Sequence, residues 1–151
     1  MKSSRASLPD RTGPFTTALF GVFGAGKGGA LYAVIVFLIG FLLGTIRILL
    51  LAPRLGETTA VIVEAPMMLT ASWFVCGWCV DRLDVTRTVR ARSLMGAVAF
   101  LVLMSAEAGL GAGFGRSLLD QLAGYGSLAG AIGLAAQVIF AMFPVVRVWR
   151  R

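Results

Sequence analysis

The fold of this chain is decided by residues 40–71, whose sequence is GFLLGTIRILLLAPRLGETTAVIVEAPMMLTA. This stretch holds two apolar runs, and each run contains one charge, Arg47 in the first and Glu64 in the second. The runs are joined by residues 53–56 (PRLG), a composition typical of a turn. In a helical hairpin that reverses there, Arg47 faces the region around Ile62 to Glu64. The two charges therefore fall at about the same depth.

A lone charge in hydrocarbon costs about 3 kcal/mol on insertion scales, so a partner at matched depth is the least costly explanation of both residues. We predict that Arg47 and Glu64 form an ion pair. This pair could be structural and fix the hairpin, or it could belong to a functional site. A third interpretation, in which Arg47 extends to the headgroups, also stays open.

The composition assigns the whole chain to the membrane. Of its 151 residues 58% are hydrophobic and only 14% are charged, which leaves more apolar surface than a soluble domain of this size can bury. We predict an all-α polytopic membrane protein with four transmembrane helices in an antiparallel bundle. Each span has about 20 residues, the length that crosses a hydrocarbon core of about 30 Å. The spans are expected at residues 31–51, 58–80, 92–110 and 128–148, within a domain of residues 29–151.

The first 28 residues are predicted to be a cytoplasmic tail and an interfacial segment. Residues 1–13 are polar and basic, as in a flexible tail. Residues 14–29 are apolar but glycine-rich and too short to span, so we expect them to lie on the inner surface of the membrane.

The net charge of +7 comes from 14 basic and 7 acidic residues. A basic balance can indicate nucleic-acid binding, but here the basic residues flank apolar runs, as topology signals do. We therefore predict the lipid bilayer as a partner and no nucleic acid. Most of the arginines and lysines precede the first span, lie between the second and third spans, or end the chain, which places both termini in the cytoplasm. Tyr32, Trp78 and Trp149 then fall at the inner interface and Tyr125 at the outer one.

This orientation gathers the acidic residues of the spans in the outer leaflet or its interface. The candidate polar cluster consists of Arg47, Glu57, Glu64 and Glu107. Glu57 has an ordinary explanation, because an anion is stabilised at a helix N-terminus. Glu107 is ambiguous between a surface position and a functional one. With no histidine and only two cysteines, the sequence predicts no metal site and no cofactor.

Small residues and one amide mark the expected helix contacts. Gly40, Gly44 and Arg47 share a helix face, which turns Arg47 toward a closely approaching neighbour. Gln137 is expected to donate a hydrogen bond between helices. Pro66 removes a backbone donor and frees the carbonyl of Ile62, which favours either a polar pocket or a simple kink. The full set of predicted helix-packing residues is Gly40, Gly44, Pro66, Gly126, Gly130 and Gln137.

Cys76 and Cys79 have the C-x-x-C spacing of dithiol oxidoreductases. Four-helix bundles that pass electrons from dithiols to quinone are similar in outline. However, these two cysteines lie at the inner end of the second span, facing a reducing compartment, with no second pair for exchange. We interpret them as small packing residues.

The hairpin resembles an uncharacterised group of small bacterial integral membrane proteins. The resemblance covers about a third of the chain and consists of three motifs. These are Gly44-Thr45-Ile46-Arg47, the run PRLGE at residues 53–57, and Glu64-Ala65-Pro66. It implies four spans in a bacterial inner membrane, and it implies no activity and no residue roles.

Three hypotheses about function follow. The first is a non-enzymatic small membrane subunit of a larger complex, or a homo-oligomer, whose contact surfaces are the glycine pairs Gly40/Gly44 and Gly126/Gly130. The second is a small carrier or channel for a proton, a cation or a small polar solute that uses Glu64 and Arg47. The third is a membrane enzyme acting on a lipid or quinone, for which no nucleophile, metal set or cofactor motif is present. Enzymatic activity is therefore not expected.

Overall fold

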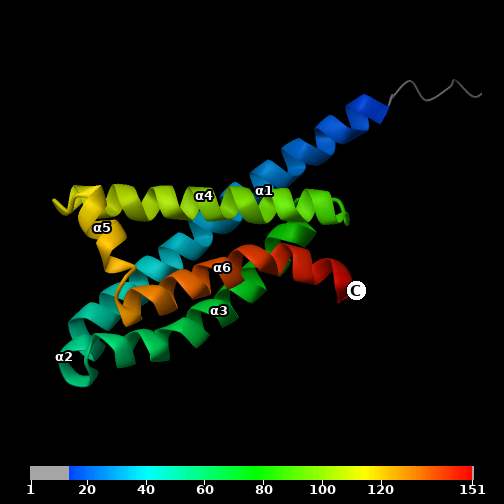
Figure 1. Cartoon of the computed structure of the whole chain (residues 1–151). Coiled ribbons are helices and arrows are strands. Elements are labelled where there is room, and N and C mark those ends of the chain that lie inside the picture. Colours follow the sequence, from blue (N-terminus) through cyan, green and yellow to red (C-terminus); the bar gives the residue numbers. More distant parts are fainter. Residues whose placement is uncertain (1–13, 151) are drawn as a thin grey trace, which may run out of the picture.

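The structure is a computed structural model that describes residues 14–150, with side chains from residue 21 on. All regular secondary structure in this part of the chain is helical. Four helices are long and apolar enough to cross a membrane, and the last three of them contain their predicted spans in full. The first predicted span, residues 31–51, begins in the first helix and ends in the π-helical turn that follows Ile46. The four helices are α1 (Pro14–Ile46), α3 (Glu57–Arg82), α4 (Val89–Gly113) and α6 (Leu128–Trp149), shown in Figure 1. These four candidate spans indicate a multi-pass membrane protein.

The first helix is longer than its predicted span. Residues 14–29, expected as a separate interfacial segment, continue into the first span without a break, because α1 is one helix from Pro14 to Ile46. The predicted cytoplasmic tail, residues 1–13, lies outside the described residues.

The hairpin reverses at a single residue. After α1 the chain makes a π-helical turn, Arg47–Leu51, in which the Ala52 N–H donates to the carbonyl of Arg47. It then forms the short helix α2 (Ala52–Leu55) and turns at Gly56, whose φ of 80° lies in the left-handed region that favours glycine. The predicted turn at residues 53–56 is therefore wrong in extent, because all but the last of these residues are helical.

Consecutive long helices run in opposite directions (Figure 1). Helix α1 packs against α3 and α4, and α6 packs against the same two helices, so the ring order is α1–α4–α6–α3. The neighbours α1 and α4 run in the same direction. One end of the molecule holds Gly56 and the short helix α5 (Leu118–Gly124), and is termed the hairpin end. The other, which holds residues 83–88 and the end of α6, is termed the arginine end.

Two glycines set how closely the helices cross. A Cβ on Gly29 of α1 would lie 2.5 Å from the carbonyl oxygen of Met95 on α4. A Cβ on Gly96 of α4 would overlap the carbonyl oxygen of Ala141 on α6. No side chain fits at either crossing, so helix backbones approach each other as they do at small-residue contacts in membranes.

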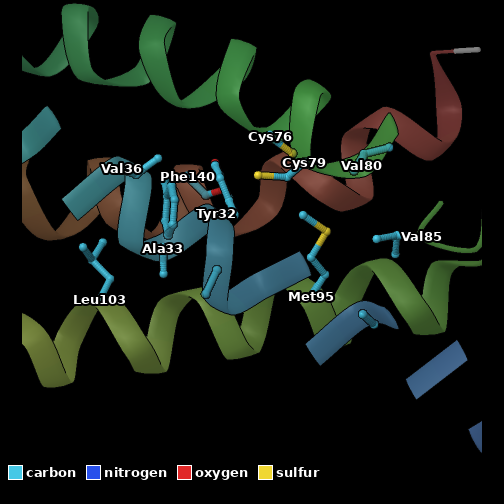
Figure 2. Close-up of a cluster of buried hydrophobic side chains, with 12 residues drawn as sticks. Tyr32, Ala33, Val36, Cys76, Cys79, Val80, Val85, Met95, Leu103 and Phe140 are labelled. Carbon is cyan, nitrogen blue, oxygen red and sulfur yellow. The ribbon is translucent and has the colours of Figure 1, made fainter. Parts of the chain in front are cut away.

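The core lies where the four long helices meet (Figure 2). Tyr32 is at its centre, 0% exposed, with its ring stacked 4.4 Å from that of Phe140 on α6. Tyr32 therefore faces the core of the bundle and not the lipid, unlike the side chains of an aromatic belt. Trp78 and Trp149 are exposed, as interfacial residues would be. Large apolar side chains cover much of the outer surface of the helices, where they would face lipid.

Candidate functional site: a polar cavity at the hairpin end

The predicted ion pair is confirmed. Arg47 Nε lies 2.6 Å from Glu64 Oε2, and the two side chains are 24% and 16% exposed. The π-helical turn begins at Arg47 and ends at Leu51, two residues before Pro53. Pro53 has no N–H to donate to the helix. The widened turn thus begins at the residue that carries the half-buried charge.

The glycine face of α1 packs against α3 of the same chain. A Cβ on Gly40 would lie 3.2 Å from Met68 Cε, and one on Gly44 would lie 3.9 Å from Glu64 Oε1. The neighbour helix expected for this face is therefore α3. Gly40 and Gly44 are turned inward and also line the cavity described below.

The second carboxylate in the spans is held by an amide. Gln137 Nε2 of α6 donates to both carboxylate oxygens of Glu107 on α4, at 2.6 and 2.7 Å. The prediction that Gln137 donates a hydrogen bond between helices is confirmed. The other polar atom of the amide, Gln137 Oε1, is buried and has no hydrogen-bond partner among the described residues.

These groups surround one cavity of about 980 Å³ at the hairpin end. Its walls come from all four long helices and from α5 and the turn that follows it. This volume is at the upper end of the range that is typical of ligand-binding sites. It brings together all four residues of the predicted polar cluster, and its polar lining is Thr45, Arg47, Glu57, Glu64, Ser72, Glu107, Arg116, Gln121, Tyr125, Ser127 and Gln137.

Helix α5 was not predicted, and it supplies one wall of the cavity. Ser117 caps its N-terminus in a capping box with Asp120, an S-x-x-D pattern that is visible in the sequence. Gln121 of α5 donates to the carbonyl of Ala108 at 3.4 Å, which ties the helix to α4. At the C-terminus of α5, burial and the nearby negative charge of Glu107 raise the pKa of Tyr125.

Of the other predicted helix-packing residues, Gly130 packs closely against another helix, whereas Pro66 and Gly126 do not lie on such a face. Pro66 is exposed on α3 and does not line the cavity. Gly126 lies in the turn between α5 and α6 and is not part of the α6 face. Gly130 packs against the carbonyl of Gly124, at the end of α5, so closely that a Cβ would overlap it.

The two cysteines are outside the cavity. Cys76 and Cys79 are free thiols, both 0% exposed, in the core beside Tyr32 and Met95 (Figure 2). Their burial fits the interpretation as packing residues, since a thiol that exchanges with a partner must be reached by it.

Sequence reasoning missed two inward-facing arginines at the arginine end. Arg92 was interpreted as a topology signal, yet it is only 4% exposed. Arg147 lies against α3, where Gly77 leaves room for its guanidinium group. Both arginines lie at the ends of apolar runs, where basic residues usually face water or headgroups. Their position in the sequence therefore gives no sign that they point inward.

Compared with known protein families, curated proteins and solved structures, the chain has no match. The cavity and its side chains are therefore the basis on which a function can be argued.

Proposed function

We propose that this chain is a small carrier that takes up a proton or a small cation at Glu107 in the polar cavity. It would reside in a bacterial inner membrane as an antiparallel bundle of four spans, with the first turns of α1 at the inner interface. The charge bias of the connecting segments favours an orientation with the hairpin end outside and both termini in the cytoplasm.

The observation that carries the proposal is the environment of Glu107. Its carboxylate accepts hydrogen bonds from the neutral amide of Gln137 and forms no ion pair with any residue between 14 and 150. By contrast, the charge of Glu64 is balanced by Arg47. Because an unbalanced charge at membrane depth is unfavourable, Glu107 favours a proton or a cation as its partner.

The charge of the whole cavity supports the same ligand class. Its charged lining consists of two arginines, Arg47 and Arg116, and three glutamates, Glu57, Glu64 and Glu107. With every group ionised the lining carries a net charge of −1. A cavity of this sign attracts a cation or a proton and repels an anion.

Gln137 can stabilise Glu107 both with and without a proton. The carboxylate accepts from Nε2, as in the structure. A protonated carboxyl group could donate to Oε1, which has no other partner in the described part of the chain. An amide offers both a donor and an acceptor, so one side chain serves the two states that a carrier must alternate between.

The subunit or homo-oligomer hypothesis has less support from the geometry. It relied on Gly40/Gly44 and Gly126/Gly130 as surfaces for a partner. Gly40 and Gly44 pack against α3, and Gly130 packs against the end of α5, all within this chain. These glycines are therefore already occupied by neighbouring helices.

The proposal can be tested in proteoliposomes that trap a pH-sensitive dye. A potassium diffusion potential should drive proton uptake in the wild-type protein, and Glu107→Gln should abolish it. Asp84→Asn is the control, because it removes an exposed carboxylate that does not line the Glu107 cavity. If the wild-type protein carries no proton current, the uptake of radioactive sodium tests whether the ligand is a small cation.

Unchanged transport in Glu107→Gln would overturn the proposal. An absence of both proton and sodium uptake, together with copurification of a stoichiometric partner, would favour the subunit hypothesis instead.

A further inference from the structure

A second cavity, of about 520 Å³, lies at the arginine end, at the opposite end of the bundle from Glu107. It is formed by the last turns of α3 and α6, the connecting residues 83–88 and the start of α4. Its lining residues are Trp73, Val80, Asp81, Asp84, Val85, Thr86, Arg87, Arg92, Arg147 and Arg150. Four arginines and two aspartates give this lining a net charge of +2, opposite in sign to the first cavity.

Arg92 is the most buried of the four arginines. Its side chain is 4% exposed, and it donates from Nε to the carbonyl of Thr86 at 3.3 Å and from Nη2 to the carbonyl of Val85 at 2.9 Å. Its third nitrogen, Nη1, is buried and has no hydrogen-bond partner in the described residues. A buried guanidinium group held by two neutral carbonyls keeps its full charge, and a nitrogen without a partner adds a desolvation penalty.

Arg147 is fixed on the opposite wall. Its Nη2 donates to the carbonyl of Trp73 at 2.6 Å, and its guanidinium carbon lies 4.3 Å from the centroid of the Trp73 ring. Gly77 is required beneath it, because a Cβ there would lie 2.5 Å from Nη1. Its Nε is also buried without a hydrogen-bond partner in the described part of the chain.

Two exposed arginines complete the lining. Arg150 lies over the same Trp73 ring at 5.4 Å, and Arg87 comes from the segment between α3 and α4. Two buried or half-buried and two exposed guanidinium groups around one cavity are suited to a phosphate, whose several oxygens each accept charge-assisted hydrogen bonds. A single carboxylate would match fewer donors.

We propose that this arginine cavity binds a phosphate group. It lies where the spans end, which is where headgroups would surround a membrane bundle, and basic pockets between membrane helices are suited to anionic headgroups. A soluble phosphate compound offers the same chemistry. The binding site is independent of Glu107 and of transport.

The probe for the soluble source is inorganic phosphate added to purified, delipidated protein in detergent. Phosphate should raise the melting temperature relative to chloride at equal ionic strength, because a ligand that binds only the folded state stabilises it. The probe for the lipid source is native mass spectrometry after incubation with vesicles of phosphatidylglycerol or of phosphatidylcholine. Retained phosphatidylglycerol identifies a headgroup as the ligand, and a response to phosphate alone identifies a soluble one.

The decisive variant is Arg87→Gln/Arg150→Gln, because both side chains are exposed and the fold does not depend on them. It should weaken the binding of whichever probe responds by about tenfold or more, since charge-assisted hydrogen bonds disappear. The matched control is Arg82→Gln/Arg90→Gln. It removes two exposed arginines from the same end of the molecule that do not line the cavity.

The control variant should bind as the wild type does. Equal weakening in both double variants would mean that only the general positive charge attracts phosphate, and would overturn the proposal. A wild-type protein that responds to neither probe would overturn it as well.

Discussion

The Tyr32 hydroxyl of α1 donates a hydrogen bond of 3.1 Å to the carbonyl oxygen of Phe140 on α6. In a regular helix that carbonyl would accept from the N–H of residue 144, but residue 144 is a proline and has none. The tyrosine thus replaces a missing backbone donor at the centre of the core.

Replacing Tyr32 with phenylalanine should lower the free energy of unfolding by about 1–3 kcal/mol, the cost of leaving a buried carbonyl without a partner. In a Pro144→Ala background, where the backbone donor returns, the same replacement should cost clearly less. Denaturation in mixed micelles measures both values. Equal costs in the two backgrounds would show that the hydrogen bond does not compensate for Pro144.

The Arg47–Glu64 pair should behave as a coupled unit. Arg47→Leu or Glu64→Leu alone leaves an uncompensated charge, which costs about 3–5 kcal/mol in buried pairs, whereas the double variant should be far more stable than the sum of the two losses predicts. Stability of the purified variants checks this expectation. If the losses add, the 2.6 Å contact contributes no coupling. Proton uptake should survive in the double variant, since Glu107 is intact.

The close helix crossing at Gly96 should not tolerate even one methyl group. Gly96→Ala should destabilise the protein by about 1–3 kcal/mol, because the carbonyl of Ala141 must move to make room. Gly109→Ala, in the same helix with nothing within 4 Å of the added carbon, is the control and should be neutral or stabilising. Thermal unfolding of the two variants compares them directly. A neutral Gly96→Ala would mean that α4 and α6 are farther apart.

The stabilisation of α5 by its N-terminal cap should depend on pH. Hydrogen bonds from the Ser117 hydroxyl and backbone lower the pKa of Asp120 from its ordinary value of 3.8. Because the folded pKa is the lower one, the cap stabilises α5 fully above the ordinary pKa and loses this effect as the pH falls through the lowered pKa. Ser117→Ala should raise the pKa of Asp120, as a carboxylate carbon NMR titration would record. An unchanged pKa would mean that the side-chain bond does not form.

The orientation in the membrane can be tested with two matched cysteines. Ser117 and Thr88 are both exposed N-cap residues, at the hairpin end and the arginine end respectively. In a background with Cys76 and Cys79 replaced by alanine, Ser117→Cys should react with an impermeant reagent added outside intact cells, and Thr88→Cys should not. The reverse labelling pattern would place the Glu107 cavity on the cytoplasmic side.

The sequence predicted the structure best where a charge interrupts an apolar run. Each span follows from its length and composition. The Arg47–Glu64 contact follows because a charge at membrane depth has few places for a partner, and a short turn fixes which residues face each other. The pairing of Gln137 with a neighbouring helix follows from the same argument.

Features that depend on how helices cross could not be predicted in this way. The chain has 19 glycines, and nothing local distinguishes Gly29 and Gly96, where backbones meet, from Gly109, which meets nothing. Tyr32 and Arg92 were both expected at the surface because of their position near span ends. Their burial depends on partners far along the chain or in a connecting loop, the carbonyls of Phe140, Val85 and Thr86.

The ring order also constrains how the protein is made. During synthesis α1 and α3 leave the ribosome as a hairpin, yet α1 makes its closest crossing with α4, at Gly29. The groove beside Gly29 therefore remains open to lipid until the third span has inserted. A chain interrupted before residue 89 would hold its first spans in the membrane but lack both α4 and α6, whose Met95, Ala99 and Phe140 share the core with Tyr32 and Ala33. Such an intermediate leaves this face of α1 without the helices that cover it.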